Sequence, residues 1–237
     1  MQAVILCGGL GTRLRPVTEK IPKALVEVAG RPFLEVQLEE LARAGVGEAV
    51  LLTGYLGEMV KKRFGSGGGG LPRLRYSRES RPLGTGGALK LAAPLLADRF
   101  LLVNGDTFLP ADYRGLLRAL ERFPGGGVLT AFPASGSGRV PNLRLSQEGV
   151  VTGYDRRGDP DAGFAYVDAG VGAFHRGLLR VFPPEESFPL EEKAYPALVA
   201  RARLGALISP EDFYDIGTPA RLVRFEKFLS SRRSRQP

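Results

Sequence analysis

The amino-acid sequence predicts an α/β protein, a three-layer sandwich around a mostly parallel sheet with a small antiparallel insert. Over the first 135 residues, short apolar runs typical of buried strands alternate with amphipathic helical segments. The rhythm then changes to short strands joined by tight turns. The chain has 237 residues, of which 43% are hydrophobic and 24% charged, and this composition is ordinary for a globular domain.

Each element of the parallel part follows from a local pattern. "AVILC" (3–7) is a short apolar run and predicts a buried first strand. In "PFLEVQLEELARAG" (32–45), apolar residues recur on one helical stripe between a proline and a glycine, which indicates a capped helix. By the same criteria we expect strands at 48–55, 74–79, 99–106 and 127–134, and helices at 57–65, 86–98 and 112–125.

After about residue 135 the pattern predicts the antiparallel insert. Two strands joined by the turn "SQEG" are expected at 142–155, and another strand at 165–175. A helix follows at 189–205, where Pro196 is expected to kink or restart it. The last elements are a strand region at 205–217 and a helix at 218–231, with Thr218 as its N-cap. We expect one domain over residues 1–230 and a solvated basic tail over 231–237.

Charge and composition limit the classes of function. The formal net charge is +8, and 26 of the 33 basic residues are arginine, whose planar guanidinium suits phosphate and carboxylate ligands. Outside the C-terminal "SSRRSRQP" the basic residues are scattered, so we expect no nucleic-acid partner. No apolar run reaches the ~18 residues that span a bilayer and no secretory signal is evident, which favours a cytoplasmic protein with no membrane partner.

The single cysteine and the single histidine lie far apart in the sequence. Cys7 sits in an apolar strand, so we expect a buried, unreactive thiol. His175 is expected to be an exposed residue at a helix start. Neither pattern favours nucleophilic catalysis.

The glycine loop after the first strand is the first candidate for chemistry. In open α/β sheets, ligands bind beyond the carboxyl ends of the strands, and glycines let backbone amides approach a phosphate chain. A Walker A loop does not fit, and a dinucleotide fingerprint fails because Leu14 stands where its third glycine is required. Prolines keep the chain irregular to about residue 31. We therefore expect Arg13 and Lys23 to bind phosphates from a long ordered loop.

The segment "GGLGTRLRPVTEKIPKALVEVAGRP" (8–32) resembles the opening signature of the sugar-1-phosphate nucleotidylyltransferases. The resemblance extends to about residue 230 and implies a Rossmann-like fold of the nucleotide-diphospho-sugar transferase type. It implies a nucleotide-binding part over about 1–135 and a sugar-binding part over about 136–218. In this family the arginine and lysine of the loop contact the phosphates, so the resemblance implies catalytic roles for Arg13 and Lys23. Longer relatives append a left-handed β-helix, and we expect none here.

Two further segments, "LLVNGDT" (101–107) and "DFYDIGTP" (212–219), resemble the family's metal-binding elements and imply Asp106 and Asp215 as Mg²⁺ ligands. Each aspartate follows a hydrophobic strand, so both are expected at the same edge of the sheet. Mg²⁺ favours one or two carboxylates, with phosphates and water completing its octahedron. The resemblance also implies nucleotide contacts from the following residues: Leu6, Gly8, Gly9, Gly11, Thr12, Glu79, Gly84 and Thr85.

The stretch "SRESRPLGTGGALKLA" (77–92) bears on the base. In the family this region lines the nucleobase, and its glycine-rich turn lets the base lie against the backbone. The spelling "LGTGGAL" is similar to guanylyltransferases acting on heptose or mannose 1-phosphate. The carboxylate of Glu79 can accept from the adjacent N1–H and N2–H₂ donors of guanine, which favours GTP. Uridylyltransferases acting on N-acetylmuramate 1-phosphate have a similar acidic segment, so a uridylyltransferase for that or another hexose 1-phosphate remains an alternative.

For the sugar half, the family has a Glu-Lys pair and then an Asn-Ala-Gly or Thr-Gly element. This chain has "GYDRRG" (153–158) and "VDAGVGAF" (167–174) there, which implies sugar contacts from Asp155, Arg156, Asp168 and Gly170 but leaves the sugar unassigned. The implied reaction joins an NTP and a sugar 1-phosphate, giving an NDP-sugar and pyrophosphate. A non-catalytic regulatory relative is the second alternative, and the sequence permits a homo-oligomer.

Overall fold

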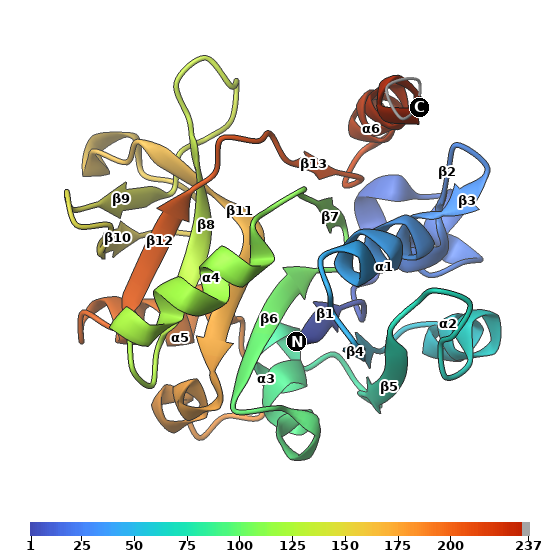
Figure 1. Cartoon of the computed structure of the whole chain (residues 1–237), viewed down its shortest axis with the longest axis horizontal. Coiled ribbons are helices and arrows are strands. Elements are labelled where there is room, and N and C mark those ends of the chain that lie inside the picture. The colour runs from blue at the N-terminus through green and yellow to red at the C-terminus, as the bar shows by residue number, and fades with distance from the viewer. Residues whose placement is uncertain (234–237) are drawn as a thin grey trace.

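The computed structural model describes residues 1–233 and shows a three-layer α/β arrangement (Figure 1). Within these residues one large sheet has nine strands, in which β10, β9, β11, β6, β1, β4 and β5 follow one another, and β8 joins β11 to β12. The strands are β1 Gln2–Leu6, β4 Glu48–Thr53, β5 Arg73–Arg78, β6 Arg99–Asn104, β8 Gly127–Pro133, β9 Leu143–Leu145, β10 Val151–Tyr154, β11 Tyr166–His175 and β12 Leu204–Ile208.

The core of this sheet is parallel and its insert is antiparallel, as the sequence predicts. Strand β1 runs parallel to β4 and β6, β4 to β5, and β8 to β12. Strand β11 runs antiparallel to β6 and β8, and its register shifts between Asp168 and Gly172. Strands β9 and β10 form the predicted hairpin. The carboxyl ends of β1, β4, β5 and β6 therefore meet at one edge, where a ligand site of an open sheet is expected.

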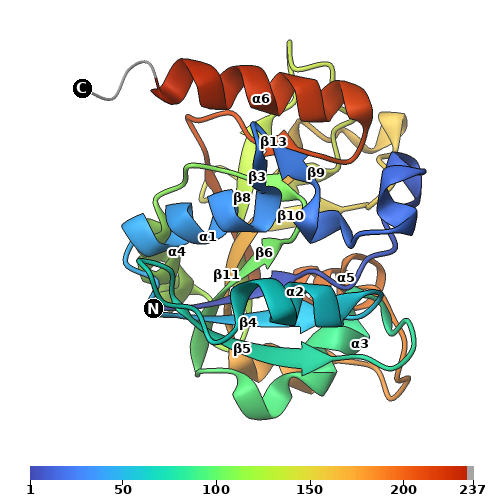
Figure 2. The same ribbon diagram turned by 90° about the vertical axis from the view of Figure 1, so that its right-hand side faces the viewer.

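Helices cover both faces of the sheet (Figure 2). Along β1, Ala3 and Ile5 join one apolar core, and Val4 points into the other. Helices α1, α2 and α4 pack on the first face, and α3 and α5 on the second. Their bounds are α1 Phe33–Arg43, α2 Gly57–Phe64, α3 Gly84–Leu91, α4 Tyr113–Ala119 and α5 Leu190–Val199. In the described part of the chain, no helix has the length and apolar character needed to cross a membrane.

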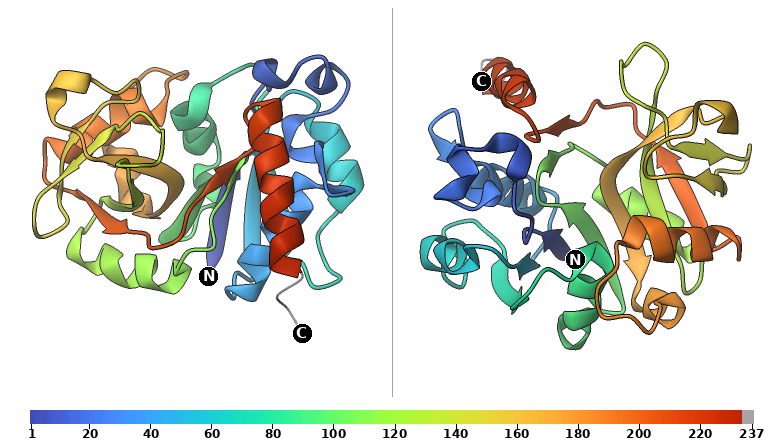
Figure 3. Two further views of the ribbon diagram at one scale, coloured as in Figure 1. Left: turned by 90° about the horizontal axis from the view of Figure 1, so that it is seen from above. Right: turned by 180° about the vertical axis from the view of Figure 1, so that it is seen from behind.

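The last helix, α6 (Pro219–Arg233), lies beside α1 and anchors the end of the chain (Figure 3). Its Phe225 packs against Phe33 and Phe108, with ring centroids 5.5 and 5.1 Å apart. The Thr218 hydroxyl accepts a hydrogen bond from the Arg221 N–H at 3.4 Å, which confirms the predicted N-cap. Short strands complete this region: β2 Glu27–Val28, β3 Arg31–Pro32, β7 Thr107–Phe108 and β13 Tyr214–Asp215.

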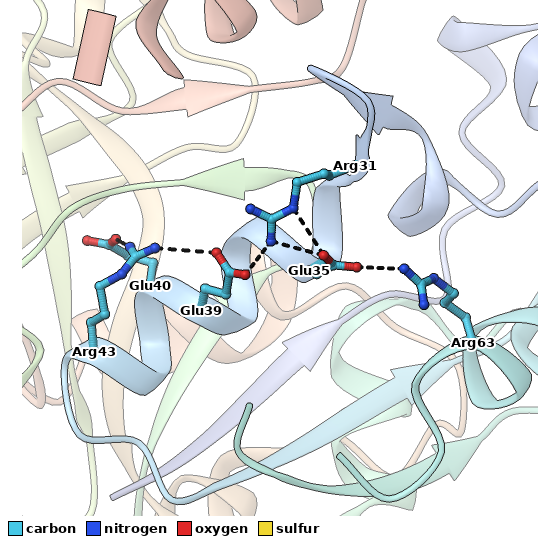
Figure 4. A network of polar contacts seen from close by, with 6 residues as sticks. All are labelled: Arg31, Glu35, Glu39, Glu40, Arg43 and Arg63. Carbon is cyan, nitrogen blue, oxygen red and sulfur yellow. Dashed lines mark hydrogen bonds and ion pairs between the residues drawn. The ribbon is translucent and has the colours of Figure 1, made fainter. Parts of the chain in front are cut away.

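An ion-pair network runs along the exposed side of α1 (Figure 4). Glu35 pairs with Arg31 and with Arg63 of α2, each at 2.9 Å. Farther along the helix, Arg31 and Arg43 both pair with Glu39. Glu40 pairs with Arg43 and with Arg232 of α6. The network therefore ties α1 to β3, to α2 and to α6, which follows the whole sheet in sequence.

Three sequence expectations need correction. Helix α5 continues through Pro196 and does not restart there, because this proline removes only one N–H and the carbonyl that it leaves unpaired lies in the first turn. His175 ends β11 and, as expected, begins a helix, the 3-10 turn Arg176–Val181, but it is partly buried rather than exposed, and its Nε2 atom has no hydrogen-bond partner among the described residues. The expected tail begins inside α6, which extends to Arg233; residues 234–237 lie outside the described part.

Between these elements the chain makes short 3-10 turns. They are Thr12–Leu14, Val17–Glu19, Lys23–Leu25, Ala93–Leu95, Leu120–Arg122, Pro160–Ala162 and Arg176–Val181. The first three keep the segment after β1 irregular until α1 begins at Phe33, as the prolines in this segment predict.

Candidate functional site

A cavity of about 1040 Å³ opens at the carboxyl edge of the parallel strands. The loops that follow β1, β4, β5 and β6 line it, together with part of α3 and the start of α5. Twelve of the residues singled out in the sequence lie on its wall: Leu6, Gly8, Gly9, Gly11, Thr12, Arg13, Lys23, Glu79, Gly84, Thr85, Asp106 and Arg156. Asp155, Asp168, Gly170 and Asp215 are not part of this wall.

The glycine loop has a fixed shape that depends on Gly11. Its φ of 63° is left-handed, and a Cβ at this position would lie 2.9 Å from the Thr18 methyl group and 3.3 Å from the Cβ of Lys23. The Thr18 hydroxyl donates to the Gly11 carbonyl at 2.8 Å. Leu14 is buried in the apolar cluster beneath α6. A side chain at Gly11 would therefore disturb the segment that carries Lys23.

Lys23 and Asp106 come together at the centre of the site. The Lys23 Nζ atom lies 2.5 Å from Asp106 Oδ2, and the two side chains are 14% and 28% exposed. Asp106 follows β6, whereas Lys23 belongs to the loop after β1. A basic group expected to bind phosphate and a carboxylate expected to bind metal therefore neutralise each other in this structure.

Asp215 lies next to Asp106 although 108 residues separate them in sequence. Strand β13 pairs with β7 so that Asp215 is opposite Thr107, and the Ile216 N–H donates to the Asp106 carbonyl at 3.0 Å. Both oxygens of Asp215 accept from Arg221 at 3.1 Å. The two aspartates thus reach one edge of the sheet through direct backbone pairing, in agreement with the sequence expectation.

Arg13 approaches the same edge beside Gly217. A Cβ on Gly217 would lie 2.8 Å from Asp215 Oδ1 and 3.1 Å from a guanidinium nitrogen of Arg13. The Arg13 side chain is exposed at the cavity wall and has no hydrogen bond or ion pair to another described residue. Gly217 therefore leaves room for both groups, and the Arg13 guanidinium is available to an anionic ligand.

The carboxylate pair is the part of the site that could hold a divalent metal. Among the described residues, no cluster of three or more His, Cys, Asp or Glu side chains could hold a metal ion. Asp106 and Asp215 are 28% and 21% exposed, so each retains an accessible side. Two carboxylates suit Mg²⁺ when phosphate oxygens and water supply the other ligands. The residues fit such an ion only together with a bound nucleotide.

Glu79 lies on the cavity wall beside the glycine loop, where two glycines leave room for its side chain. A Cβ at Gly8 or Gly54 would lie 3.0 or 2.6 Å from its Oε1 atom. Its Oε2 atom accepts from the Leu83 N–H at 3.0 Å. Burial raises the pKa of Glu79, and the Leu83 hydrogen bond opposes that rise. The side chain is held at the wall with acceptor capacity remaining on its carboxylate.

Cys7 has the inert environment predicted for it. The side chain is buried at the carboxyl end of β1, and its residue is 6% exposed. Burial, followed by the negative charge of Asp106, raises the pKa of the thiol to about 12. The thiolate needed for nucleophilic chemistry is therefore disfavoured at neutral pH.

The glycine-rich start of α3 packs against its own chain. Gly84 has a φ of 70°, and a Cβ there would lie 2.7 Å from the Phe188 carbonyl oxygen. A side chain at Gly86 would overlap the Phe188 ring. The sequence expectation assigned this glycine-rich turn to contact with a base. The structure shows that Gly84 and Gly86 leave room for Phe188, and the base contact stays a prediction. Thr85 donates to Glu191 Oε2 at 2.7 Å and accepts from the Leu190 N–H at 2.8 Å, which ties α3 to α5.

The residues predicted to bind sugar divide between the cavity rim and its surroundings. Arg156 lines the cavity and pairs with Glu192 at 3.0 Å. Asp155 instead shapes its own turn by accepting from the Arg157 N–H at 2.9 Å. The structure thus separates the side chains of this predicted acidic–basic pair.

Asp168 and Gly170 line a small second cavity with Glu191. The Asp168 carboxylate accepts from the Gly170 N–H at 2.9 Å and from the Tyr154 hydroxyl at 3.3 Å. Burial raises the pKa of Asp168 to about 6; the Gly170 hydrogen bond opposes that rise and the nearby Glu191 adds to it. Glu191 also lines the large cavity, so it stands between the two. Its sequence context, "PLEEK", is an ordinary helix start and gave no sign of this position.

A nucleotide-sized cavity with a glycine loop and paired carboxylates, at the carboxyl edge of a parallel sheet, defines an α/β protein that handles phosphorylated ligands. The sequence model described as "Nucleotidyl transferase" matches residues 2–135, and the chain belongs to this family. Within it, the chain is a sugar-1-phosphate nucleotidylyltransferase by its relatives. The roles of the individual site residues stay predictions.

Two curated relatives illustrate the similarity. A D-glycero-alpha-D-manno-heptose 1-phosphate guanylyltransferase from Campylobacter jejuni is 31% identical over 228 residues, which cover 95% of this chain and 98% of that protein. A mannose-1-phosphate guanylyltransferase from Mycobacterium tuberculosis is 32% identical over 229 residues, which cover 94% of this chain and 63% of the relative.

Solved structures agree with the fold. The crystal structure of HddC from Yersinia pseudotuberculosis has a TM-score of 0.82 and 26% identity, covering 96% of this chain and 99% of that one. A structure of the same protein complexed with GMP-PN has a TM-score of 0.80, 25% identity and the same coverage. These similarities support the three-layer α/β fold.

Proposed function

We propose that this protein transfers a guanylyl group from GTP to a sugar 1-phosphate of the heptose or mannose type, giving a GDP-sugar and pyrophosphate. The observation that carries the proposal is that Arg13, Lys23 and Asp106 line one cavity, with Asp215 brought next to Asp106 by the pairing of β13 with β7. The relatives named guanylyltransferases and the related structure with a guanine nucleotide analogue support the choice of base. Residues 1–135 would hold the nucleotide and residues 136–218 the sugar.

The proposed step is a single displacement at phosphorus. An oxygen of the sugar 1-phosphate attacks the α-phosphorus of GTP and forms a new P–O bond. The bond from that phosphorus to the oxygen bridging to the β-phosphate breaks, and pyrophosphate departs with the electron pair. Because the attacking phosphate oxygen is already ionised at neutral pH, no general base is required, and catalysis consists of alignment and charge neutralisation.

Each basic residue has a place in this scheme. Arg13, exposed at the wall, would stabilise the negative charge that develops on pyrophosphate. Lys23 would bind the α-phosphate and the acceptor phosphate after leaving its ion pair with Asp106. Asp106 and Asp215 would hold Mg²⁺, which supplies charge neutralisation to the phosphates when bound.

Glu79 would select the base. Guanine presents adjacent N1–H and N2–H₂ donors, and a carboxylate offers only acceptors. One oxygen of Glu79 already accepts from the Leu83 N–H, which orients the group toward the cavity that it lines. Uracil would place carbonyl oxygens beside the same carboxylate and be disfavoured.

On the sugar side, Arg156 and Glu191 line the main cavity, and Asp168 lies behind them in the smaller one. Carboxylates accept from sugar hydroxyls, and an arginine can bind the sugar phosphate. We assign these three residues to the sugar 1-phosphate, in place of the predicted Asp155, whose carboxylate shapes its own turn.

A substrate matrix tests the proposal. GTP, UTP, CTP and dTTP are each combined with mannose, glucose and D-glycero-α-D-manno-heptose 1-phosphates in Mg²⁺, and pyrophosphate release is measured. The expected result is turnover with GTP and a manno-configured sugar, at least tenfold above every other nucleotide. Faster turnover with UTP would favour the uridylyltransferase alternative, and no release in any combination would favour the non-catalytic one.

A further inference from the structure

Gln37 is a polar residue in the apolar face of α1. Its residue is 2% exposed, and it is flanked on the helix by the buried Leu34, Leu38 and Leu41. Burying an amide group without giving it hydrogen-bond partners destabilises the folded state. A leucine or methionine would pack at such a position without this cost, so the contacts of Gln37 require a separate explanation.

The amide nitrogen of Gln37 binds the backbone on both sides of Asp106. Nε2 donates to the Asn104 carbonyl at 2.9 Å and to the Thr107 carbonyl at 2.6 Å. The amide oxygen is buried and has no hydrogen-bond partner among the described residues. The opposite amide orientation would place this oxygen against two carbonyl oxygens, so the observed donors are required. Gln37 therefore donates to two carbonyls of the turn, while its own amide oxygen is left without a hydrogen bond among the described residues.

Other contacts hold the same turn from different directions. The Gly105 N–H donates to the Leu6 carbonyl at 3.1 Å, and the Asp106 carbonyl accepts from the Ile216 N–H at 3.0 Å. Gly170 leaves space for the turn, since a Cβ there would lie 2.8 Å from the Asn104 amide nitrogen. Gln37 provides the contact from the helix layer.

We propose that Gln37 is a positioning residue that holds the Asn104–Thr107 turn so that the Asp106 carboxylate faces the nucleotide and its metal. The inference rests on the proposed function, because it gives Asp106 a role in metal binding. Gln37 reaches no reacting atom and acts through the backbone of the turn. Partners behind a metal ligand typically change metal affinity or activity 10–100-fold when they are removed.

The test measures Mn²⁺ binding by electron paramagnetic resonance, in the presence of a non-hydrolysable GTP analogue, alongside turnover in Mg²⁺. Gln37→Met removes the amide and keeps the side-chain length, and Gln37→Asn keeps an amide that is too short. Leu41→Ala, another buried change on α1, is the matched control for lost stability. Both Gln37 variants are expected to raise the Mn²⁺ dissociation constant about 10–100-fold, and Leu41→Ala to leave it unchanged while lowering Tm.

Asp106→Asn distinguishes the metal role of Asp106 from the positioning role of Gln37. It should weaken Mn²⁺ binding by itself, and adding Gln37→Met to it should weaken binding no further, because both act at one carboxylate. Normal Mn²⁺ binding and turnover in Asp106→Asn would overturn the metal role in the proposed function. An impaired Asp106→Asn together with Gln37 variants that behave like Leu41→Ala would overturn the positioning role alone.

Discussion

Lys23 and Asp106 form an ion pair with 2.5 Å between Nζ and Oδ2, at the point where the glycine loop and the end of β6 meet. Lys23 is proposed to bind phosphate and Asp106 to bind the metal. Nucleotide binding would therefore replace this ion pair with a contact from Lys23 to phosphate and a contact from Asp106 to the metal. The pair neutralises a partly buried carboxylate and a partly buried ammonium, each of which would be costly to leave alone. The structure thus shows an ion pair between two groups that are each predicted to bind part of the ligand.

The first prediction separates the two roles of this pair. Lys23→Ala should reduce turnover about 10²–10³-fold, the usual effect of losing one electrostatic stabiliser. Mn²⁺ binding with a GTP analogue should be no weaker than in the wild type, because Asp106 loses a competing cation. Lys20→Ala, an exposed change in the same loop, is the control. A parallel loss of Mn²⁺ binding would mean that Lys23 assembles the metal site.

The second prediction concerns Arg13. Arg13→Ala should reduce turnover about 10²–10³-fold, since it would remove the cation that faces pyrophosphate. The Tm should remain unchanged, because this exposed side chain has no hydrogen-bond or ion-pair partner in the described part of the chain. Steady-state kinetics and a melting curve measure the two quantities, with the exposed Arg15→Ala as control. Turnover close to that of the wild type would remove Arg13 from the site.

The third prediction concerns the base. Glu79→Gln should lower kcat/KM for GTP at least about tenfold, because the glutamine NH₂ group would face a guanine donor without an acceptor between them. The ratio of kcat/KM for GTP to kcat/KM for UTP should fall as well. A glutamine oxygen can still accept from Leu83, so the loop should keep its shape. Glu58→Gln, on the neighbouring α2, is the comparison variant. If the ratio of kcat/KM values for GTP and UTP stays constant, Glu79 does not recognise the base.

The fourth prediction is a pH dependence at Asp168. Its folded pKa is raised from 3.8 to about 6, so its contribution to stability is fully present below about pH 3.8 and is lost as pH rises through 6. Asp168→Asn removes this titration and keeps an oxygen for the Gly170 N–H. The Tm of the variant relative to the wild type should therefore be higher at pH 7.5 than at pH 4.5. A difference in Tm that does not vary with pH would contradict the raised pKa.

The fifth prediction concerns the network along α1 in Figure 4. Glu35→Gln breaks the contacts to Arg31 and Arg63 and should lower the free energy of unfolding by about 1 kcal/mol in low salt. The loss should shrink at high ionic strength, because partly exposed charges are screened. Glu121→Gln breaks one exposed pair with Arg99 and should have a smaller effect. Equal losses in the two variants would show that the network adds nothing beyond its single pairs.

Much of the fold was accessible from the sequence because its signals are local. Alternating apolar runs and amphipathic stripes predicted the parallel core and the hairpin of β9 and β10, and the N-cap at Thr218 followed from its own few residues. The expectation that Pro196 would restart the helix was wrong for the same reason, because it used only local sequence. A proline is judged locally as a helix breaker, whereas its position near the end of α5 makes it tolerable.

The candidate site was predicted unevenly. Motifs that are continuous in sequence placed Arg13, Lys23 and Asp106 at one cavity. Asp155 and Arg156 were assigned together from the resemblance to the family's Glu-Lys pair, but the Asp155 carboxylate accepts a hydrogen bond within its own turn. Glu191 and Gln37 gave no signal because each resembles an ordinary helix residue until the packing of distant segments is known.

The sequence by itself determined the class of fold, and it predicted the glycine loop as a phosphate site and Asp106 and Asp215 as a pair of metal ligands. Only the tertiary structure decided that Lys23 pairs with Asp106 and that Asp215 lies next to Asp106 although 108 residues separate them. It also decided that Gln37 donates from the core to the turn that carries Asp106. Strand and helix formation depends on neighbours in sequence, so local patterns record it. The juxtaposition of side chains depends on how the layers pack, and that is settled only when the whole chain folds.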